Sequence, residues 1–300
     1  MLNALLASYD KHILVETNNY KVLRDLQNNR FAGTQVPGFS FSKDLSNTNI
    51  DFKFSFLEKG ERAYFMEDFE NNKMVLKTQY EKKISFGQLT WLFAPIFEYL
   101  HQKQNRFSLH AAAYGKKKEA IVYVSEGGGG KTTSSLEMCL NRDFEFIGDE
   151  RILVDSTKKP QVLCGNPVIH VRKETLPFFS KLNTLRKKAK VYIYPEEVGI
   201  IKKNYNYSIK HLVFSRLSTC NIIKKINKES AILNLFKNAS EVIRRVGCCI
   251  VSLNIPLNSL DTKNLTINRW NNIVRVFSSV EYHMIEGSKD FIGGYLESLL

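Results

Sequence analysis

The sequence predicts an α/β protein with a central mixed sheet flanked by helices, preceded by a small α+β region. Two observations predict this class. Residues 121–124 form the short apolar run of a buried strand, four glycines follow, and Lys131 then opens a segment with helical spacing. Before residue 105, apolar and polar residues alternate in several short segments, as in half-buried strands. We therefore predict an N-terminal α+β subdomain over residues 1–104 and an α/β domain over residues 105–300.

The composition is that of a globular chain. With 300 residues, 43% of them hydrophobic, it can bury a sizeable core. Uninterrupted apolar runs long enough to span a membrane are missing, as are the features of a signal peptide, so we expect a cytoplasmic protein. The five cysteines show no C-x-x-C spacing, which favours reduced thiols over metal or redox sites.

The positive charge is concentrated in one part of the chain. The net charge is +13, and residues 181–245 contain 15 Lys and Arg against 4 Asp and Glu, a local excess of 11. Such a segment attracts an acidic partner, although a solvated lysine-rich surface is the alternative. The charges are scattered among Tyr, Ile and Leu, so we do not expect nucleic acid as the main partner.

The first hundred residues predict a mixed set of elements. Residues 1–30 are expected to be rich in helix, whereas the alternation from residue 50 to 56 indicates a half-buried strand. Residues 64–69 and 73–80 are expected to continue a meander, with a turn over residues 70–72. Apolar residues at helical spacing predict a helix over residues 86–104, with a bend at Pro95.

The remaining residues predict alternating strands and helices. We expect strands over residues 107–113, 120–124, 191–194, 210–214 and 249–253. Helices are expected over residues 132–140, 229–246 and 268–280.

The glycine-rich loop has the chemistry of a phosphate-binding site. Glycines let backbone N–H groups turn toward an anion, and the next helix adds free N–H groups and a positive dipole end. In such loops a lysine reaches the β- and γ-phosphates of ATP or GTP, and a hydroxyl ligates Mg²⁺. A flexible turn without a ligand is the alternative, and Ser125 stands where the usual pattern has glycine. The predicted nucleotide-binding residues are Gly127, Gly128, Gly129, Gly130, Lys131, Thr132 and Thr133.

Two adjacent acids, Asp149 and Glu150, end the apolar segment that follows the loop helix. Asp149 stands 18 residues after Lys131, a separation that one helix and a returning strand fill. A strand that delivers a carboxylate beside a phosphate loop can supply a further ligand to Mg²⁺. We therefore predict a metal site of Thr132, Asp149 and Glu150, the alternative being that the two acids form an exposed turn.

Three segments in this order resemble the HPr kinase/phosphorylase-like family of P-loop proteins, which is related to phosphoenolpyruvate carboxykinases. The segments are residues 109–113 with His110, the loop over residues 125–133, and residues 148–151. The resemblance covers residues 107–178, including a Gly-Asn-Pro turn after the acids. It does not extend to the segment used for phosphorolysis, so it implies a divergent member similar to kinases that modify a serine of a small peptide.

The resemblance implies transfer of the γ-phosphoryl group of ATP or GTP to a hydroxyl, with a serine of an acidic or Ser-containing peptide or protein as the acceptor. It implies Asp149 as the base, Lys131 on the phosphates, and Thr132 with Glu150 on Mg²⁺. His110 would lie behind Asp149 and tune its proton affinity, the alternative being a core histidine. Assembly into a homo-oligomer is also implied.

Three other functions stay open. The altered loop and Glu150 are compatible with a nucleotide-binding regulatory or scaffolding module that transfers nothing. The related carboxykinases act on small acids, which favours a small-molecule phosphotransferase. The basic segment is compatible with an NTPase associated with nucleic acid.

Overall fold

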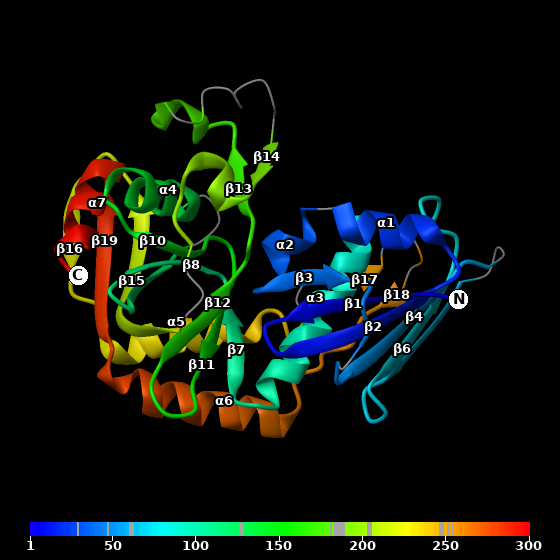
Figure 1. Cartoon of the computed structure of the whole chain (residues 1–300). Helices are drawn as coiled ribbons and strands as arrows, with labels where there is room; N and C mark the ends of the chain where they lie inside the picture. Colours follow the sequence, from blue (N-terminus) through cyan, green and yellow to red (C-terminus); the bar gives the residue numbers. More distant parts are fainter. Residues whose placement is uncertain are drawn as a thin grey trace.

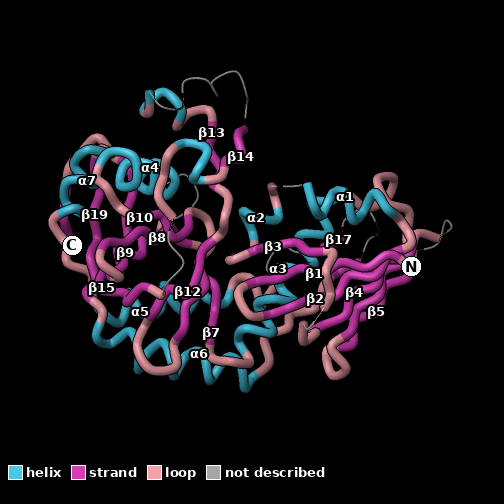
Figure 2. The backbone as a smooth tube through the Cα atoms, viewed as in Figure 1, coloured by secondary structure: helices cyan, strands magenta, loops and turns pink. Residues whose placement is uncertain are grey.

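The computed structural model describes residues 1–28, 30–46, 48–59, 63–125, 129–180, 182, 190–202, 206–245, 249–250, 253 and 255–300. It is a mixed α/β protein, which confirms the predicted class at that level. Most of the strands gather into two groups with helices around them, one group near each end of the view (Figures 1 and 2). In the described part of the chain, no helix is long and apolar enough to cross a membrane.

The first sheet is built from residues before 78 and is mixed. Its order is β3-β1-β2-β4-β6-β5, with β2, β4 and β6 parallel to one another. The predicted strand at residue 50 is confirmed as β4, whereas the predicted meander is wrong because β4 pairs with β6 and not with β5. The strands are β1 (Leu2–Ser8), β2 (Lys11–Thr17), β3 (Phe39–Ser42), β4 (Phe52–Leu57), β5 (Tyr64–Asp68) and β6 (Lys73–Lys77).

Three helices, α1 (Tyr20–Asn28), α2 (Ala32–Gln35) and α3 (Phe86–Gln102), pack with this sheet. The expected helix-rich start is therefore wrong for the first 17 residues, which form a hairpin. The predicted helix over residues 86–104 is confirmed as α3, and a capping box between Ser85 and Gln88 fixes its start. Phe93 of α3 packs edge-on against Phe54 of β4, so the alternating aromatic residues of the sheet supply its core.

The second sheet is mixed and holds nine strands. At its centre β15 runs parallel to both β9 and β19, while most other pairs are antiparallel. Its strands are β7 (Arg106–Leu109), β8 (Ala111–Lys116), β9 (Glu119–Val124), β10 (Glu145–Gly148), β11 (Ile152–Asp155), β12 (Gln161–Gly165), β15 (Tyr207–Leu217), β16 (Ile222–Lys224) and β19 (Glu281–Gly287). Two small ribbons pair β13 (Ile169–Arg172) with β14 (Lys190–Ile193) and β17 (Cys249–Ile250) with β18 (Ile255–Pro256).

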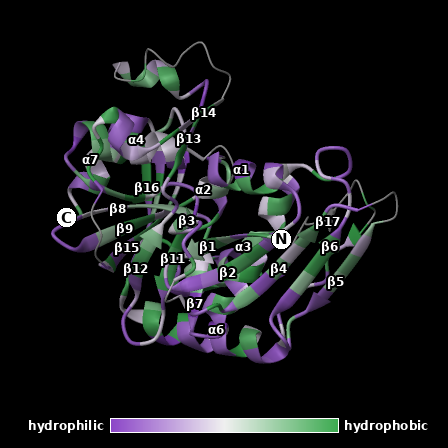
Figure 3. Cartoon of the chain, turned by 45° about the vertical axis from the view of Figure 1, so that its right-hand side comes forward, coloured by the Kyte–Doolittle hydropathy of each residue, from purple (hydrophilic) through white to green (hydrophobic). Residues whose placement is uncertain are grey.

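Helices cover both faces of the second sheet (Figure 1). They are α4 (Lys131–Asn141) and α7 (Lys289–Glu297) on one face, and α5 (Lys228–Ser240) and α6 (Lys263–Val276) on the other. Alternate residues of one strand therefore enter different cores: Val122 of β9 packs on the α5 side, and Tyr123 packs on the α4 side. Figure 3 shows hydrophilic and hydrophobic residues interspersed along α6, as expected for a helix with one buried face.

The expected single strand over residues 107–113 is interrupted at His110. β7 pairs with β11, whereas β8 pairs with β9 and β10. The ladder keeps one register across the break, because the pairs Gly148–Ala113 and Ile152–Leu109 lie four residues apart on both strands. β7 and β8 thus form one long segment that runs antiparallel to a second segment formed by β10 and β11. The regular pairing of both segments is interrupted at the same place, at His110 and at the turn that holds Asp149 and Glu150.

A buried polar network joins the two sheets. Glu98 of α3 accepts hydrogen bonds from Ser108 of β7 and from Gln102. Gln102 in turn accepts a hydrogen bond from Arg269 of α6, whose guanidinium also pairs with Asp261 at 2.7 Å. These hydrogen bonds are shielded from water and link α3 to the second sheet, although Nε of Arg269 has no hydrogen-bond partner among the described residues.

Candidate functional site

The glycine-rich loop leads from β9 into α4, as predicted. Gly130 has a φ of 93°, and α4 begins at the next residue. This backbone conformation favours glycine, and a Cβ at Gly130 would lie 2.6 Å from Cγ of Leu217. Gly129 and Thr133 are buried beside it, whereas the predicted residues Gly127 and Gly128 lie outside the described part of the chain.

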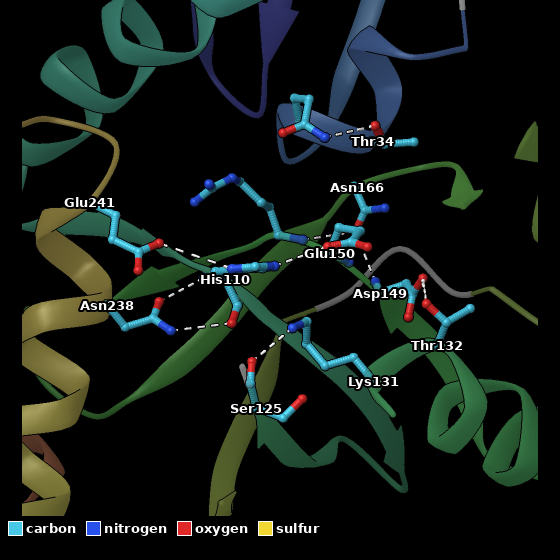
Figure 4. A network of polar contacts seen from close by, with 12 residues as sticks. Thr34, His110, Ser125, Lys131, Thr132, Asp149, Glu150, Asn166, Asn238 and Glu241 are labelled. Atoms are coloured by element: carbon cyan, nitrogen blue, oxygen red, sulfur yellow. Dashed lines mark hydrogen bonds and ion pairs between the residues drawn. The ribbon is translucent and has the colours of Figure 1, made fainter. Parts of the chain in front are cut away.

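Lys131 folds back over the loop. Its Nζ donates a hydrogen bond to the carbonyl oxygen of Ser125 at 2.8 Å, across the base of the loop (Figure 4). Burial lowers the pKa of Lys131, while the carboxylates of Glu150 and Asp149 act in the opposite direction. The ammonium group of Lys131 is therefore poorly solvated, and a bound anion could take the place of the Ser125 carbonyl as its partner.

Asp149 lies against the first turn of α4. Its Oδ2 accepts a hydrogen bond from Thr132 Oγ1 at 2.9 Å, which joins the loop to the acids (Figure 4). The residue is 0% exposed, so the alternative of an exposed turn is wrong for Asp149. Burial, and then the charge of Glu150, raise the pKa of the Asp149 carboxyl to about 7. Its other oxygen, Oδ1, is buried, and the nearby Ser135 hydroxyl acts against the rise in the pKa.

Asn166 holds the backbone of the acid turn. Its Oδ1 accepts hydrogen bonds from the N–H groups of Asp149, Glu150 and Arg151, at 2.8, 3.1 and 3.2 Å. Its Nδ2 donates to the carbonyl of Val168, and the side chain is fully buried. One amide therefore satisfies three donors that the interrupted ladder leaves without strand partners.

His110 lies opposite this turn and is held from the other side. The side chain of Asn238 on α5 makes two hydrogen bonds to its backbone. It accepts one from the N–H of His110 at 2.7 Å and donates one to the carbonyl oxygen of His110 at 3.2 Å. The side chain of His110 pairs with Glu150, with Nε2 3.0 Å from Oε2, and not with Asp149 as the resemblance implied. Glu241 lies on the other side, 4.0 Å from Nδ1.

The pKa of Glu150 is low although the residue is largely buried. Burial alone would raise the pKa of its carboxyl, but the hydrogen bond and charge of His110, with Lys131, outweigh this effect. The two adjacent acids therefore differ, since the pKa of Asp149 is raised and that of Glu150 is lowered. Pairs of carboxyl groups with separated pKa values are typical of sites with distinct acid, base or ligand roles.

Two pockets meet at His110. The first, of about 410 Å³, lies over the start of α4 and is lined by Gly129, Gly130, Lys131, Thr132, Thr133, Glu150, Arg172, Glu174, Thr175, Phe178, Leu217 and His110. The second, of about 590 Å³, lies over the ends of β9, β15 and β19 and against α5. Its polar lining includes His110, Ser125, Ser215, Arg216, Asn234, Lys237, Asn238, Glu241 and Glu286. His110 is shared by the two pockets.

The sequence motifs missed several residues of this site. Asn166 belongs to the Gly-Asn-Pro turn, whose sequence signals a turn but not an amide that caps the acids. The contact of Asn238 with His110 could not be predicted, because a polar residue on an amphipathic helix normally faces solvent. Arg172 also lines the first pocket.

Comparison with known proteins adds no family to these observations. The sequence matches no model of a known protein family, and no curated protein is significantly similar to it.

Proposed function

We propose that the protein is a nucleotide-dependent kinase that transfers the γ-phosphoryl group of ATP or GTP to a hydroxyl, most readily a serine of a peptide or protein. The contact between Thr132 and Asp149 carries this inference. It brings a P-loop-like strand, loop and helix against an acid pair that is distant in sequence. Nucleotide binding alone needs only the loop, whereas group transfer also needs acids beside the terminal phosphate.

The phosphates would occupy the first pocket. Lys131, Arg172 and the N-terminal N–H groups of α4 all border it and supply positive charge. Binding there would replace the Ser125 carbonyl as the partner of Lys131. The same groups would neutralise the charge of the transferring group, which is the main requirement of phosphoryl transfer.

The residues around Asp149 fit Mg²⁺. This ion prefers hard oxygen ligands, and the Thr132 hydroxyl and both oxygens of Asp149 are of that kind. Asp149 Oδ1 is buried with at most the Ser135 hydroxyl beside it, so it has a lone pair that can bind a cation. When bound, Mg²⁺ would neutralise phosphate charge. Its presence would also ionise the carboxyl group of Asp149, whose pKa is raised to about 7 in its absence.

Glu150 and His110 are our candidates for accepting the proton. The family resemblance implied this role for Asp149, but Asp149 is fully buried, whereas Glu150 and His110 both border the first pocket. A hydroxyl entering from the second pocket would approach His110. Its oxygen would form a bond to the γ-phosphorus as the bond to the nucleoside diphosphate breaks, and its proton would pass to the Glu150–His110 pair.

The experiment separates binding from transfer. Purified protein is incubated with γ-labelled ATP or GTP, Mg²⁺ and Ser-containing peptides, and mass spectrometry detects the phosphate adduct. We expect Lys131→Ala to abolish the rise in melting temperature caused by nucleotide, whereas Lys158→Ala on an exposed loop should not. Unchanged nucleotide stabilisation in Lys131→Ala would refute the phosphate site.

The two acids are separated by isosteric variants. Glu150→Gln should keep Mg²⁺-dependent nucleotide stabilisation and lose transfer by about 100-fold or more. Asp149→Asn should lose the dependence of nucleotide stabilisation on Mg²⁺. If Glu150→Gln transfers phosphate at the normal rate, Glu150 is not the proton acceptor. If the original protein binds the nucleotide but never removes its γ-phosphate, the protein is a nucleotide-binding module without transfer activity.

A further inference from the structure

A second cluster of metal-ligating side chains lies on the same sheet, away from the two pockets. His211 is on β15, and Glu281 and His283 are on the parallel strand β19. The strands are paired so that His211 stands opposite Glu281. β15, β19 and α7 lie together near the C-terminus (Figure 1). Since His211 is three residues before Phe214, which pairs with the end of β9, the cluster is about 10 Å from the phosphate loop along the strand.

Three potential ligand atoms converge on one point. Nδ1 of His211 is 3.0 Å from Nε2 of His283 and 3.5 Å from Oε2 of Glu281, and the latter two atoms are 3.9 Å apart. For a triangle with these sides, one point in its plane is about 2.0 Å from all three corners, the length of Zn–N and Zn–O bonds. The three atoms are therefore close enough for one cation, and small side-chain shifts would let the ion move out of their plane to accept a fourth ligand.

Both imidazoles have a further partner outside the cluster. Nδ1 of His283 lies 2.8 Å from the hydroxyl of Tyr295 on α7. His211 uses Nδ1 toward the cluster and hydrogen-bonds the backbone of Leu299 near the end of the chain. Metal-binding histidines usually have such a partner on the nitrogen that does not bind the metal, because it fixes the ring and the tautomer.

Burial and access favour a bound ion over a solvated surface group. The side chains of His211 and His283 are 11% and 13% exposed, whereas that of Glu281 is 72% exposed. The imidazoles are thus held in place while the carboxylate side is open to solvent. The facing ring nitrogens of His211 and His283 are 3.0 Å apart, so either a proton between them or a bridging cation satisfies both, and the Glu281 carboxylate adds negative charge that favours the cation.

We propose that His211, Glu281 and His283 bind one Zn²⁺ ion, with solvent as the remaining ligand, and that the ion fastens β19 and the C-terminal residues to β15. Two imidazoles and one carboxylate form a ligand set that zinc adopts and that Mg²⁺ does not favour. This site is separate from the proposed phosphate site and does not depend on it.

Titration calorimetry on chelator-treated full-length protein tests the site. We expect one Zn²⁺ per chain, no comparable binding of Mg²⁺, and a higher melting temperature with Zn²⁺. Glu281→Gln, at an exposed position that folding does not need, should weaken binding at least tenfold, and His283→Gln should do the same. The control Asp290→Asn removes an exposed carboxylate of α7 and should bind Zn²⁺ like the original protein.

Cobalt provides a second readout that does not depend on stability. Co²⁺ in place of Zn²⁺ should give visible absorption bands of a four-coordinate site, and these should be absent in both ligand variants. Less than one Zn²⁺ per chain in the original protein would overturn the assignment. Equal Zn²⁺ affinity in Glu281→Gln, His283→Gln and the control would overturn it as well, since the ion would then bind elsewhere.

Discussion

Replacing Asn166 with alanine should destabilise the protein strongly, because one buried amide holds the whole acid turn. The variant removes the acceptor of three backbone N–H groups and the donor to Val168. A buried donor left without a partner costs about 1–3 kcal/mol. The shortest of the three hydrogen bonds is 2.8 Å long, and the other two, at 3.1 and 3.2 Å, share the same oxygen and are weaker. We therefore count the full cost for one unpaired N–H group and part of that cost for each of the other two. The expected decrease in the free energy of unfolding is about 3 kcal/mol.

Equilibrium unfolding in urea, followed by circular dichroism, measures this decrease. Asn141→Ala is the matched control, because Asn141 is exposed at the end of α4 and bonds only to Glu137 among the described residues. Its free energy of unfolding should change by no more than about 0.5 kcal/mol. If Asn166→Ala were as stable as this control, the turn would not depend on the amide and our account of how the acids are positioned would be wrong.

The other predictions concern pH and close packing. Because the pKa of Asp149 is raised from 3.8 in the unfolded chain to about 7 in the folded one, the folded state binds its proton more tightly. This contribution to stability is complete below about pH 4 and is lost as the pH rises through about 7, so Asp149→Asn should flatten that part of the stability curve in urea titrations. Gly165→Ala should cost about 3 kcal/mol or more, since its Cβ would lie 2.2 Å from the Ile147 carbonyl oxygen. Gly294→Ala, on α7 with nothing within 4 Å, should instead stabilise by about 0.5–1 kcal/mol, and a stability of Gly165→Ala equal to that of Gly294→Ala would contradict the close approach of β10 and β12.

The strand, loop and helix around Lys131 could be predicted because their signals are local. An apolar run, glycines and a helical repeat follow one another in a single short segment, and backbone preferences decide each of them. The N-terminal hairpin was missed because the two faces of β2 do not differ cleanly in polarity. Lys11 and Thr17 are on its buried face, whereas the apolar Leu14 is on the other. The buried charge of Lys11 is accommodated by Asp51, 3.2 Å away, a partner that no local pattern could reveal.

The site could be predicted only as a set of separate motifs. His110, Lys131 and Asp149 were expected near one another, but their actual partners depend on elements far along the chain. Asn238 lies 128 residues after His110 and on a helix, so only the packing of α5 brings its amide to that backbone. The same packing explains why the predicted strand over residues 107–113 divides at His110, whose N–H and carbonyl bond to Asn238 in place of a neighbouring strand.

An interruption of the sheet creates the geometry on which our proposed mechanism depends. The ladder of β7 and β8 with β10 and β11 keeps its register across the break at His110 and the acid turn, and a separate register shift lies between Phe146 and Gly148. In a continuous ladder the backbone groups of these residues would bond to each other. Here Asn166 and Asn238 bond to them instead, which frees the Glu150 and His110 side chains to meet at 3.0 Å between the two pockets. Irregularities in strand pairing re-aim side chains, and this one directs an acid and a histidine to the place where our proposed mechanism needs a proton acceptor.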